Sequence, residues 1–149
     1  MMRENRPIAW HWQRMNAATL GEGSGITPTQ NIYYKVIQNV SNLRLKSITT
    51  WQTNDEAALK TLQVIATIDG VATYSEAGLH SNNTKVSWGL RPGYITDDLI
   101  NAAPEVAAKY VSWSIKYLTS IQVRITSAVG TNQLLFCSVQ YEQLKRVIK

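Results

Sequence analysis

The chain has 149 residues, a length that fits one domain with a single hydrophobic core. Apolar residues make up 44% and Lys plus Arg outnumber Asp plus Glu by 15 to 10, which excludes a disordered chain and gives a net charge of +5. Because its apolar runs are only a few residues long, we expect no transmembrane helix and no signal peptide. The single cysteine, Cys137, excludes an intrachain disulfide and a zinc site built from several cysteines.

Alternation of apolar and polar residues predicts β-strands along most of the chain. In chain order, the candidate strands are residues 8–15, 32–40, 43–51, 61–68, 85–90, 111–117, 121–129 and 134–141. Two short helical turns are also expected, one capped by Asn54 over residues 55–59 and one capped by Thr96 over residues 97–103. About eight short strands with turn residues between them predict an all-β sandwich or barrel. We expect one domain over residues 1–149, with residues 1–9 as an N-terminal arm.

Charge is distributed unevenly along the chain. Residues 1–50 carry six basic and two acidic groups, residues 51–105 three and seven, and residues 106–149 six and one. Small domains can reach such a distribution by chance. Basic ends around an acidic middle also indicate two surfaces of opposite charge, one of which suits a polyanion.

The first residues of the chain mix cations with aromatic rings. Arginines there can contact phosphates, and flat rings can stack on bases without reading a sequence. Alternation places Trp10 and Trp12 on one face and His11 on the other, so the two tryptophans could instead anchor the arm to its own or a neighbouring domain. The short basic C-terminal end adds weaker candidates. The predicted nucleic-acid-binding residues are Arg3, Arg6, Trp10, Trp12, Arg14, Lys145 and Arg146.

Residues that could carry catalysis or hold a metal form no recognisable set. His11 and His80 show no metal-ligand spacing, and residues 21–25 are rich in glycine but lack the Lys-Ser/Thr of a phosphate-binding loop. Cys137, inside a predicted strand, is expected to be a buried apolar side chain. We therefore expect no enzyme, no cofactor and no metal. Two acidic pairs are assigned to the starts of the helical turns in preference to a calcium site: Asp55 with Glu56, and Asp97 with Asp98.

Four segments between Trp12 and Tyr94 carry a family resemblance: residues 12–14 (WQR), 23–26 (GSGI), 45–52 (LKSITTWQ) and 79–92 (LHSNNTKVSWGLRP). They resemble the coat proteins of small spherical plant satellite viruses, the satellite tobacco mosaic virus type in particular. After Tyr94 only the order of strands is similar. The resemblance implies an eight-stranded jelly roll that assembles into an icosahedral shell around single-stranded RNA. It also implies a location in the virion and, during assembly, in the host cell cytoplasm.

One feature departs from that family. Residues 1–14 hold three arginines and one glutamate, whereas the family's arm usually carries a longer and denser basic run. The nucleic acid could therefore be held by a strand or loop surface instead, or a shell could form with little nucleic acid.

The sequence thus predicts a jelly-roll viral coat protein that associates with copies of itself, contacts single-stranded nucleic acid and has no membrane partner. The alternative is a carbohydrate- or receptor-binding jelly roll, such as a fibre tip or lectin-like domain. In that alternative, exposed aromatic rings would stack on sugars, and the candidates are Trp88, Tyr94 and Trp113.

Overall fold

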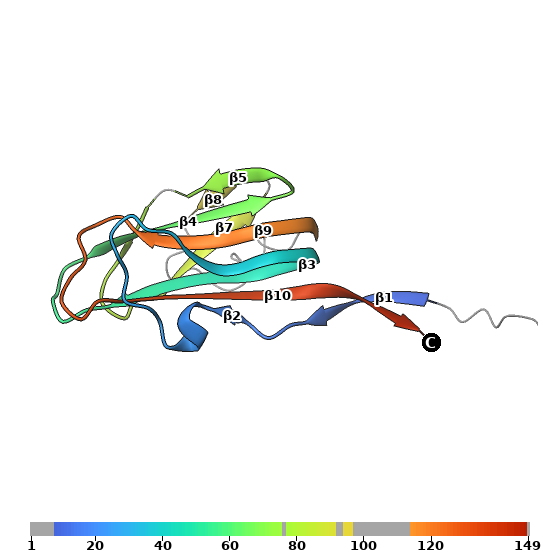
Figure 1. The fold of residues 1–149 in the computed structure, drawn as a ribbon, viewed down its shortest axis with the longest axis horizontal. Coiled ribbons are helices and arrows are strands. Elements are labelled where there is room, and N and C mark those ends of the chain that lie inside the picture. Colours follow the sequence, from blue (N-terminus) through green and yellow to red (C-terminus); the bar gives the residue numbers. More distant parts are fainter. Residues whose placement is uncertain (1–7, 76, 92–93, 97–113, 149) are drawn as a thin grey trace, which may run out of the picture.

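The computed structural model describes residues 8–75, 77–91, 94–96 and 114–148, which form an antiparallel all-β fold (Figure 1). One short 3-10 helix, η1 (Leu20–Gly23), lies among the described residues, and none of their helices is long and apolar enough to cross a membrane. The predicted all-β class is confirmed. The strands are β1 (Ile8–Arg14), β2 (Ala18–Thr19), β3 (Tyr34–Thr53), β4 (Lys60–Ile68), β5 (Val71–Tyr74), β6 (Gly78–His80), β7 (Val86–Arg91), β8 (Tyr94–Thr96), β9 (Ser114–Ile125) and β10 (Leu134–Ile148).

The strands form one open sheet in the order β1-β10-β3-β9-β4-β5. β2 continues the β1 edge along β10, and β6 continues the β5 edge along β4. β7 pairs with β3 at residues 48–50 and carries β8 on its far side. β3 is the central strand, because its first half pairs with β9 and its second half pairs with β10.

β3 runs without a break where the sequence predicts two strands, at residues 32–40 and 43–51. Asn42, in the predicted break, and Asn39, just before it, have positive φ angles of 52° and 55°. Asparagine enters this left-handed region more readily than most residues, so the backbone can rotate locally while the register with β9 continues on both sides. The side chain of Asn39 is also held, because its Oδ1 accepts a hydrogen bond from the Tyr117 hydroxyl at 2.8 Å.

The helical turn predicted over residues 55–59 is wrong. Asn54 caps as expected, since its Oδ1 accepts from the backbone N–H of Glu56 at 2.8 Å. The next turn does not form, because the Asp55 N–H donates to the carbonyl of Thr131, in the loop before β10, and residues 54–59 bend toward that loop. The second predicted turn, at residues 97–103, lies outside the described residues.

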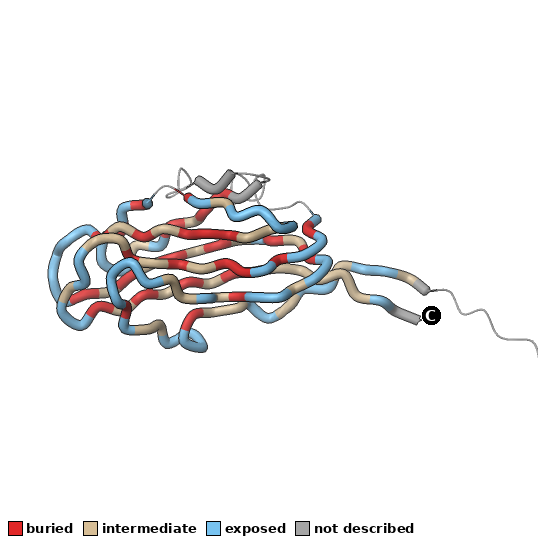
Figure 2. Tube along the Cα trace, turned by 45° about the horizontal axis from the view of Figure 1, so that its top comes forward, coloured by how far each residue is buried: buried red, intermediate tan, exposed pale blue. Residues whose placement is uncertain are grey.

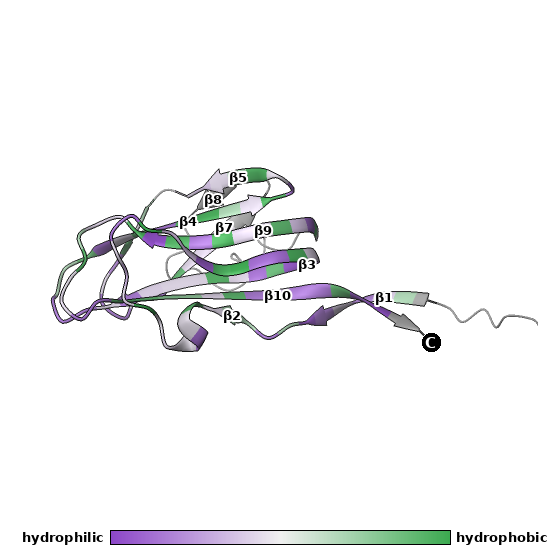
Figure 3. Cartoon of the chain, in the orientation of Figure 1, coloured by the Kyte–Doolittle hydropathy of each residue, from purple (hydrophilic) through white to green (hydrophobic). Residues whose placement is uncertain are grey.

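The hydrophobic core lies on the inward face of the sheet and includes Val86 and Trp88 of β7. Figure 2 shows buried residues interspersed with exposed and half-buried ones along the strands. Alternate residues of β4, β9, β3 and β10 point into the core, as the predicted alternation required. Figure 3 shows the hydrophilic residues that lie between these apolar positions along β3, β9 and β10. Fully buried side chains include Leu43, Leu45, Ile48, Leu62, Val64, Trp88, Ile121, Val123, Leu135, Cys137 and Val139.

β1 and the end of β10 form a two-stranded ribbon that projects beyond the rest of the sheet (Figure 1). The register runs from Ile8 opposite Ile148 to Arg14 opposite Glu142. The predicted short strand at residues 8–15 is therefore confirmed, and the last predicted strand extends well past Tyr141. This ribbon joins the two basic ends of the chain.

Candidate nucleic-acid interface

The ribbon places candidates from both ends of the chain side by side. Trp10 lies opposite Arg146, and Arg14 lies opposite Glu142. Directly opposed residues of an antiparallel pair point to the same side of the sheet. Trp10, Trp12, Arg14 and Arg146 therefore share one side. We call this side, which points away from the core along β1, β10 and the second half of β3, the outer face.

Trp12 is fixed on the outer face by a cation from β3. The guanidinium carbon of Arg44 lies 4.0 Å from the centroid of the Trp12 ring, and Arg44 is also opposite Glu142 in the β3–β10 register. Contacts of this kind contribute about 0.5–1 kcal/mol at exposed sites and more when desolvated. Trp12 is half-buried, whereas Trp10 is 58% exposed. Trp12 thus secures the ribbon to the sheet and leaves the Trp10 ring accessible.

A cluster of cations surrounds one carboxylate on this face. Lys46 Nζ lies 3.1 Å from Glu142 Oε1, and both side chains line a pocket of about 270 Å³ together with Arg14. A shift in the β3–β10 register lets Leu45 and Ile48 both point inward, which leaves Lys46 on the outside. With Arg44, three cations lie around the Glu142 carboxylate, so the cluster keeps excess positive charge.

Aromatic rings and cations continue along the second half of β3. Trp51 stacks on Phe136 of β10 with ring centroids 5.0 Å apart, and Lys85 Nζ lies 4.8 Å from the Trp51 ring centroid. Proteins that bind single-stranded nucleic acid combine positive charge with flat aromatic rings in this way.

The structure brings together only some of the predicted residues. Lys145 lies opposite His11 and points to the other side of the ribbon, so it is separate from the outer face. Arg3 and Arg6 lie outside the described residues. The sequence prediction missed three members of the outer face, Arg44, Lys46 and Trp51, and it also missed Lys85, which precedes β7 and contacts the Trp51 ring.

His80 belongs to β6 and is completely buried. Its Nδ1 lies 3.0 Å from the carbonyl of Gly78 and donates to it, so its Nε2 accepts from the Thr50 hydroxyl at 2.7 Å. Thr50 Oγ1 in turn accepts from the indole N–H of Trp88 at 2.7 Å. Burial lowers the pKa of His80 below its usual 6.5, and the Gly78 hydrogen bond partly opposes this shift. The Thr50–His80 distance resembles that of a nucleophile and its base, but no substrate reaches two fully buried groups.

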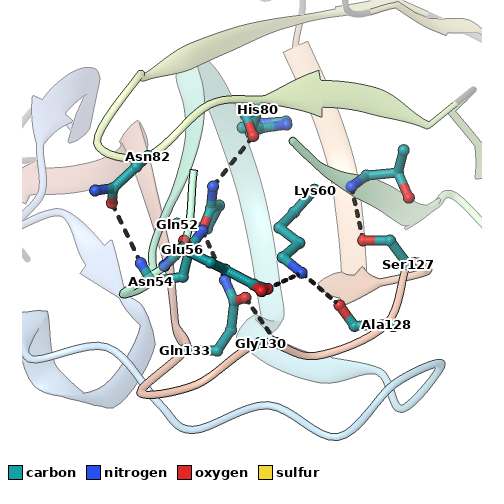
Figure 4. A network of polar contacts seen from close by, with 11 residues as sticks. Gln52, Asn54, Glu56, Lys60, His80, Asn82, Ser127, Ala128, Gly130 and Gln133 are labelled. Atoms are coloured by element: carbon teal, nitrogen blue, oxygen red, sulfur yellow. Dashed lines mark hydrogen bonds and ion pairs between the residues drawn. The ribbon is translucent and has the colours of Figure 1, made fainter. Parts of the chain in front are cut away.

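A second buried network joins β3 to the loop before β10 (Figure 4). Gln52 Oε1 accepts from the side-chain amides of Asn54 and Gln133, each at 2.7 Å, and Gln52 Nε2 donates to the His80 carbonyl at 3.1 Å. These side chains are buried, so their amides need such partners. The network fixes the loops at the end of the sheet that lies opposite the ribbon.

The acidic pair at residues 55 and 56 has a different role from the predicted one. Glu56 Oε1 accepts a hydrogen bond from Lys60 Nζ at 2.6 Å, and the same ammonium donates to the Ala128 carbonyl at 2.9 Å. Lys60 is only 5% exposed, so Glu56 neutralises a buried cation rather than a helix dipole. Asp55 accepts from the side-chain amide of Asn132. In the part of the chain that the structure describes, no three His, Cys, Asp or Glu residues form a group that could hold a metal.

The sugar-stacking role considered for Trp88 is wrong, because Trp88 is 1% exposed and its indole N–H is bonded to Thr50. Trp113 lies outside the described residues, as does the side chain of Tyr94.

No protein-family model matches this chain, and a comparison with curated proteins finds no match. The candidate site is therefore identified from the charges and aromatic rings of the outer face.

Proposed function

We propose that this protein is a jelly-roll coat protein that assembles with copies of itself into an icosahedral shell and contacts single-stranded nucleic acid through the outer face. The observation that carries the proposal is the grouping of Trp10 and Arg146 with the cluster of Arg14, Arg44 and Lys46 on one side of the sheet. The resemblance of the sequence to satellite-virus coat proteins indicates that this nucleic acid is RNA. Such a protein belongs to the virion and, before assembly, to the host cytoplasm.

The outer face suits a single strand better than a duplex. A single strand presents unstacked bases, and an exposed indole can stack on one of them with a contribution of about 1–3 kcal/mol. Trp10 has its ring available and has Arg146 beside it for a neighbouring phosphate. The excess charge around Glu142 supplies phosphate contacts that do not depend on base sequence.

Strand order supports the jelly-roll part of the proposal. Strands that are distant in sequence lie next to one another, as β1 and β10 or β3 and β9 do, which is typical of Greek-key arrangements. β7 and β8 turn away from the main row of strands, and Trp88 of β7 closes part of the core. The lectin-like alternative has less support, because its candidate Trp88 is buried.

The test of nucleic-acid contact is a salt series with a short single-stranded RNA. Changing Lys46→Gln and Arg146→Gln together removes two phosphate contacts, so the slope of log K against log salt falls by about 1.4. The matched control is Lys35→Gln with Lys145→Gln, which removes the same charge away from the outer face and leaves the slope unchanged. Equal slopes for the two double variants would overturn the proposed site.

Assembly is tested separately by particle size. Negative-stain microscopy and light scattering of the purified protein, with and without RNA, are expected to show closed particles of megadalton mass. A protein that stays monomeric in both conditions at high concentration contradicts the coat function. A trimer would favour the fibre-tip alternative.

A further inference from the structure

β1 is an open edge of the sheet. It pairs with β10 along one side, and no strand in the described part of the chain pairs with its other side. The ribbon that it forms projects from the body, so for much of its length β1 has no packed layer beneath it (Figures 1 and 2). Natural proteins usually protect such edges with proline, bulges or several charges. The seven residues of β1 contain no proline, lysine, aspartate or glutamate, and Arg14 is their one arginine.

We propose that β1 pairs antiparallel with β1 of a second copy, about a two-fold axis that passes between the two His11 residues. This inference deepens the proposed function, because it identifies one of the contacts between subunits. In the pairing, Trp10 lies opposite Trp12 of the second copy, Trp12 lies opposite its Trp10, and the two His11 residues face each other. Two identical interactions arise on either side of the axis, as two-fold symmetry requires.

The sequence of β1 is self-complementary in this register and in no neighbouring one. Antiparallel pairing of Ile8 with Arg14 uses all seven residues, and this same register forms both Trp10–Trp12 pairs. A shift of two residues either way shortens the ladder and forms a single Trp–Trp pair. The full register also places each Arg14 opposite an Ile8, so the two arginines do not oppose each other. Directly opposed aromatic residues stabilise antiparallel strands, each by about 0.2–1 kcal/mol.

The self-complementarity identifies a second copy as the occupant of the edge. A different peptide would have to supply two large rings at the same spacing. Four tryptophan rings bury at most about 600–1,000 Å², which is the size of a weak, concentration-dependent interface.

Because the axis stands perpendicular to the sheet, it keeps both outer faces on the same side. The pair therefore presents one continuous cation–aromatic surface twice the width of a single outer face.

Disulfide trapping tests this register directly. The Cα atoms of opposed antiparallel residues lie about 4.5–5.5 Å apart, within the range that a disulfide spans. His11→Cys places a thiol opposite its own copy and is expected to give a covalent dimer under mild oxidation, reversed by reductant. Gln13→Cys is the matched control, because residue 13 lies opposite Ala9 of the second copy and is expected to stay monomeric. The native Cys137 is 1% exposed and does not react.

A double variant, Ala9→Cys with Gln13→Cys, is expected to cross-link like His11→Cys, which fixes the register from a second position. Both single variants are first compared with the parent in melting temperature, so that trapping is measured on folded protein. Equal cross-linking of His11→Cys and Gln13→Cys, or none in His11→Cys at concentrations where the parent associates, overturns the inference. Either result leaves the RNA salt slopes unaffected, so failure here is distinct from failure of the proposed nucleic-acid contact.

Discussion

The hydroxyl of Thr50 is expected to be one of the most important single polar groups for stability. It accepts from Trp88 Nε1 and donates to His80 Nε2, both at 2.7 Å, and all three side chains are at most 1% exposed. Thr50→Val keeps the shape of the side chain and its preference for strands but removes both hydrogen bonds. Each buried group left without a partner costs about 1–3 kcal/mol, so the variant should lose about 2–5 kcal/mol of unfolding free energy after a small gain from the added methyl group.

The matched control is Thr49→Val, at the neighbouring position on the outside of β3. Thr49 is half-buried, and its hydroxyl makes no hydrogen bond to a described residue, so its effect should stay within about 0.5 kcal/mol. The measurement is urea unfolding followed by tryptophan fluorescence and by circular dichroism, with the slope on denaturant compared between variants. A loss below 1 kcal/mol in Thr50→Val, or equal losses in both variants, would refute the assigned hydrogen-bond chain.

Three further predictions follow from buried groups. Burial lowers the pKa of His80 in the folded protein, so below pH about 6.5 the unfolded state binds more protons than the folded state. The unfolding free energy should therefore fall as the pH decreases from there. His80→Gln should reduce that dependence, as measured by urea titrations at a series of pH values. Burial raises the pKa of the Cys137 thiol to about 12, so a thiol reagent at pH 8 should label it only after unfolding, as followed by absorbance. Glu56→Gln should lower unfolding free energy by about 1.5–3 kcal/mol because Lys60 loses its anionic partner, whereas Asp55→Asn should change it by less than about 1 kcal/mol in the same assay.

Most strands could be predicted because their inward faces alternate strictly. Leu62, Val64 and Ala66 are all fully buried, and the strand predicted at residues 61–68 differs from β4 by one residue. The predicted gap at residues 41–42 is wrong, because the left-handed backbone at Asn39 and Asn42 lets β3 continue through it. The short strands β2, β5, β6 and β8 carry too few residues to show a period.

The candidate site was predicted only in part, because its members come from distant segments. A basic arm and a basic C-terminal end are each weak signals, and only the β1–β10 register shows that Trp10 and Arg146 are neighbours. Arg44 and Lys46 resemble ordinary solvent-facing residues of a strand. Their importance comes from the Trp12 ring and the Glu142 carboxylate, which lie on other strands.

The meeting of the two chain ends in the ribbon has a consequence for biosynthesis. A ribosome makes Ile8 about 140 residues before Ile148, so β1 emerges long before its partner strand exists. Contacts of such high sequence separation form late and slowly. While translation continues, the nascent chain therefore lacks both the outer face and a paired β1. In the proposed function, contact with nucleic acid through the outer face therefore begins only after β10 has left the ribosome.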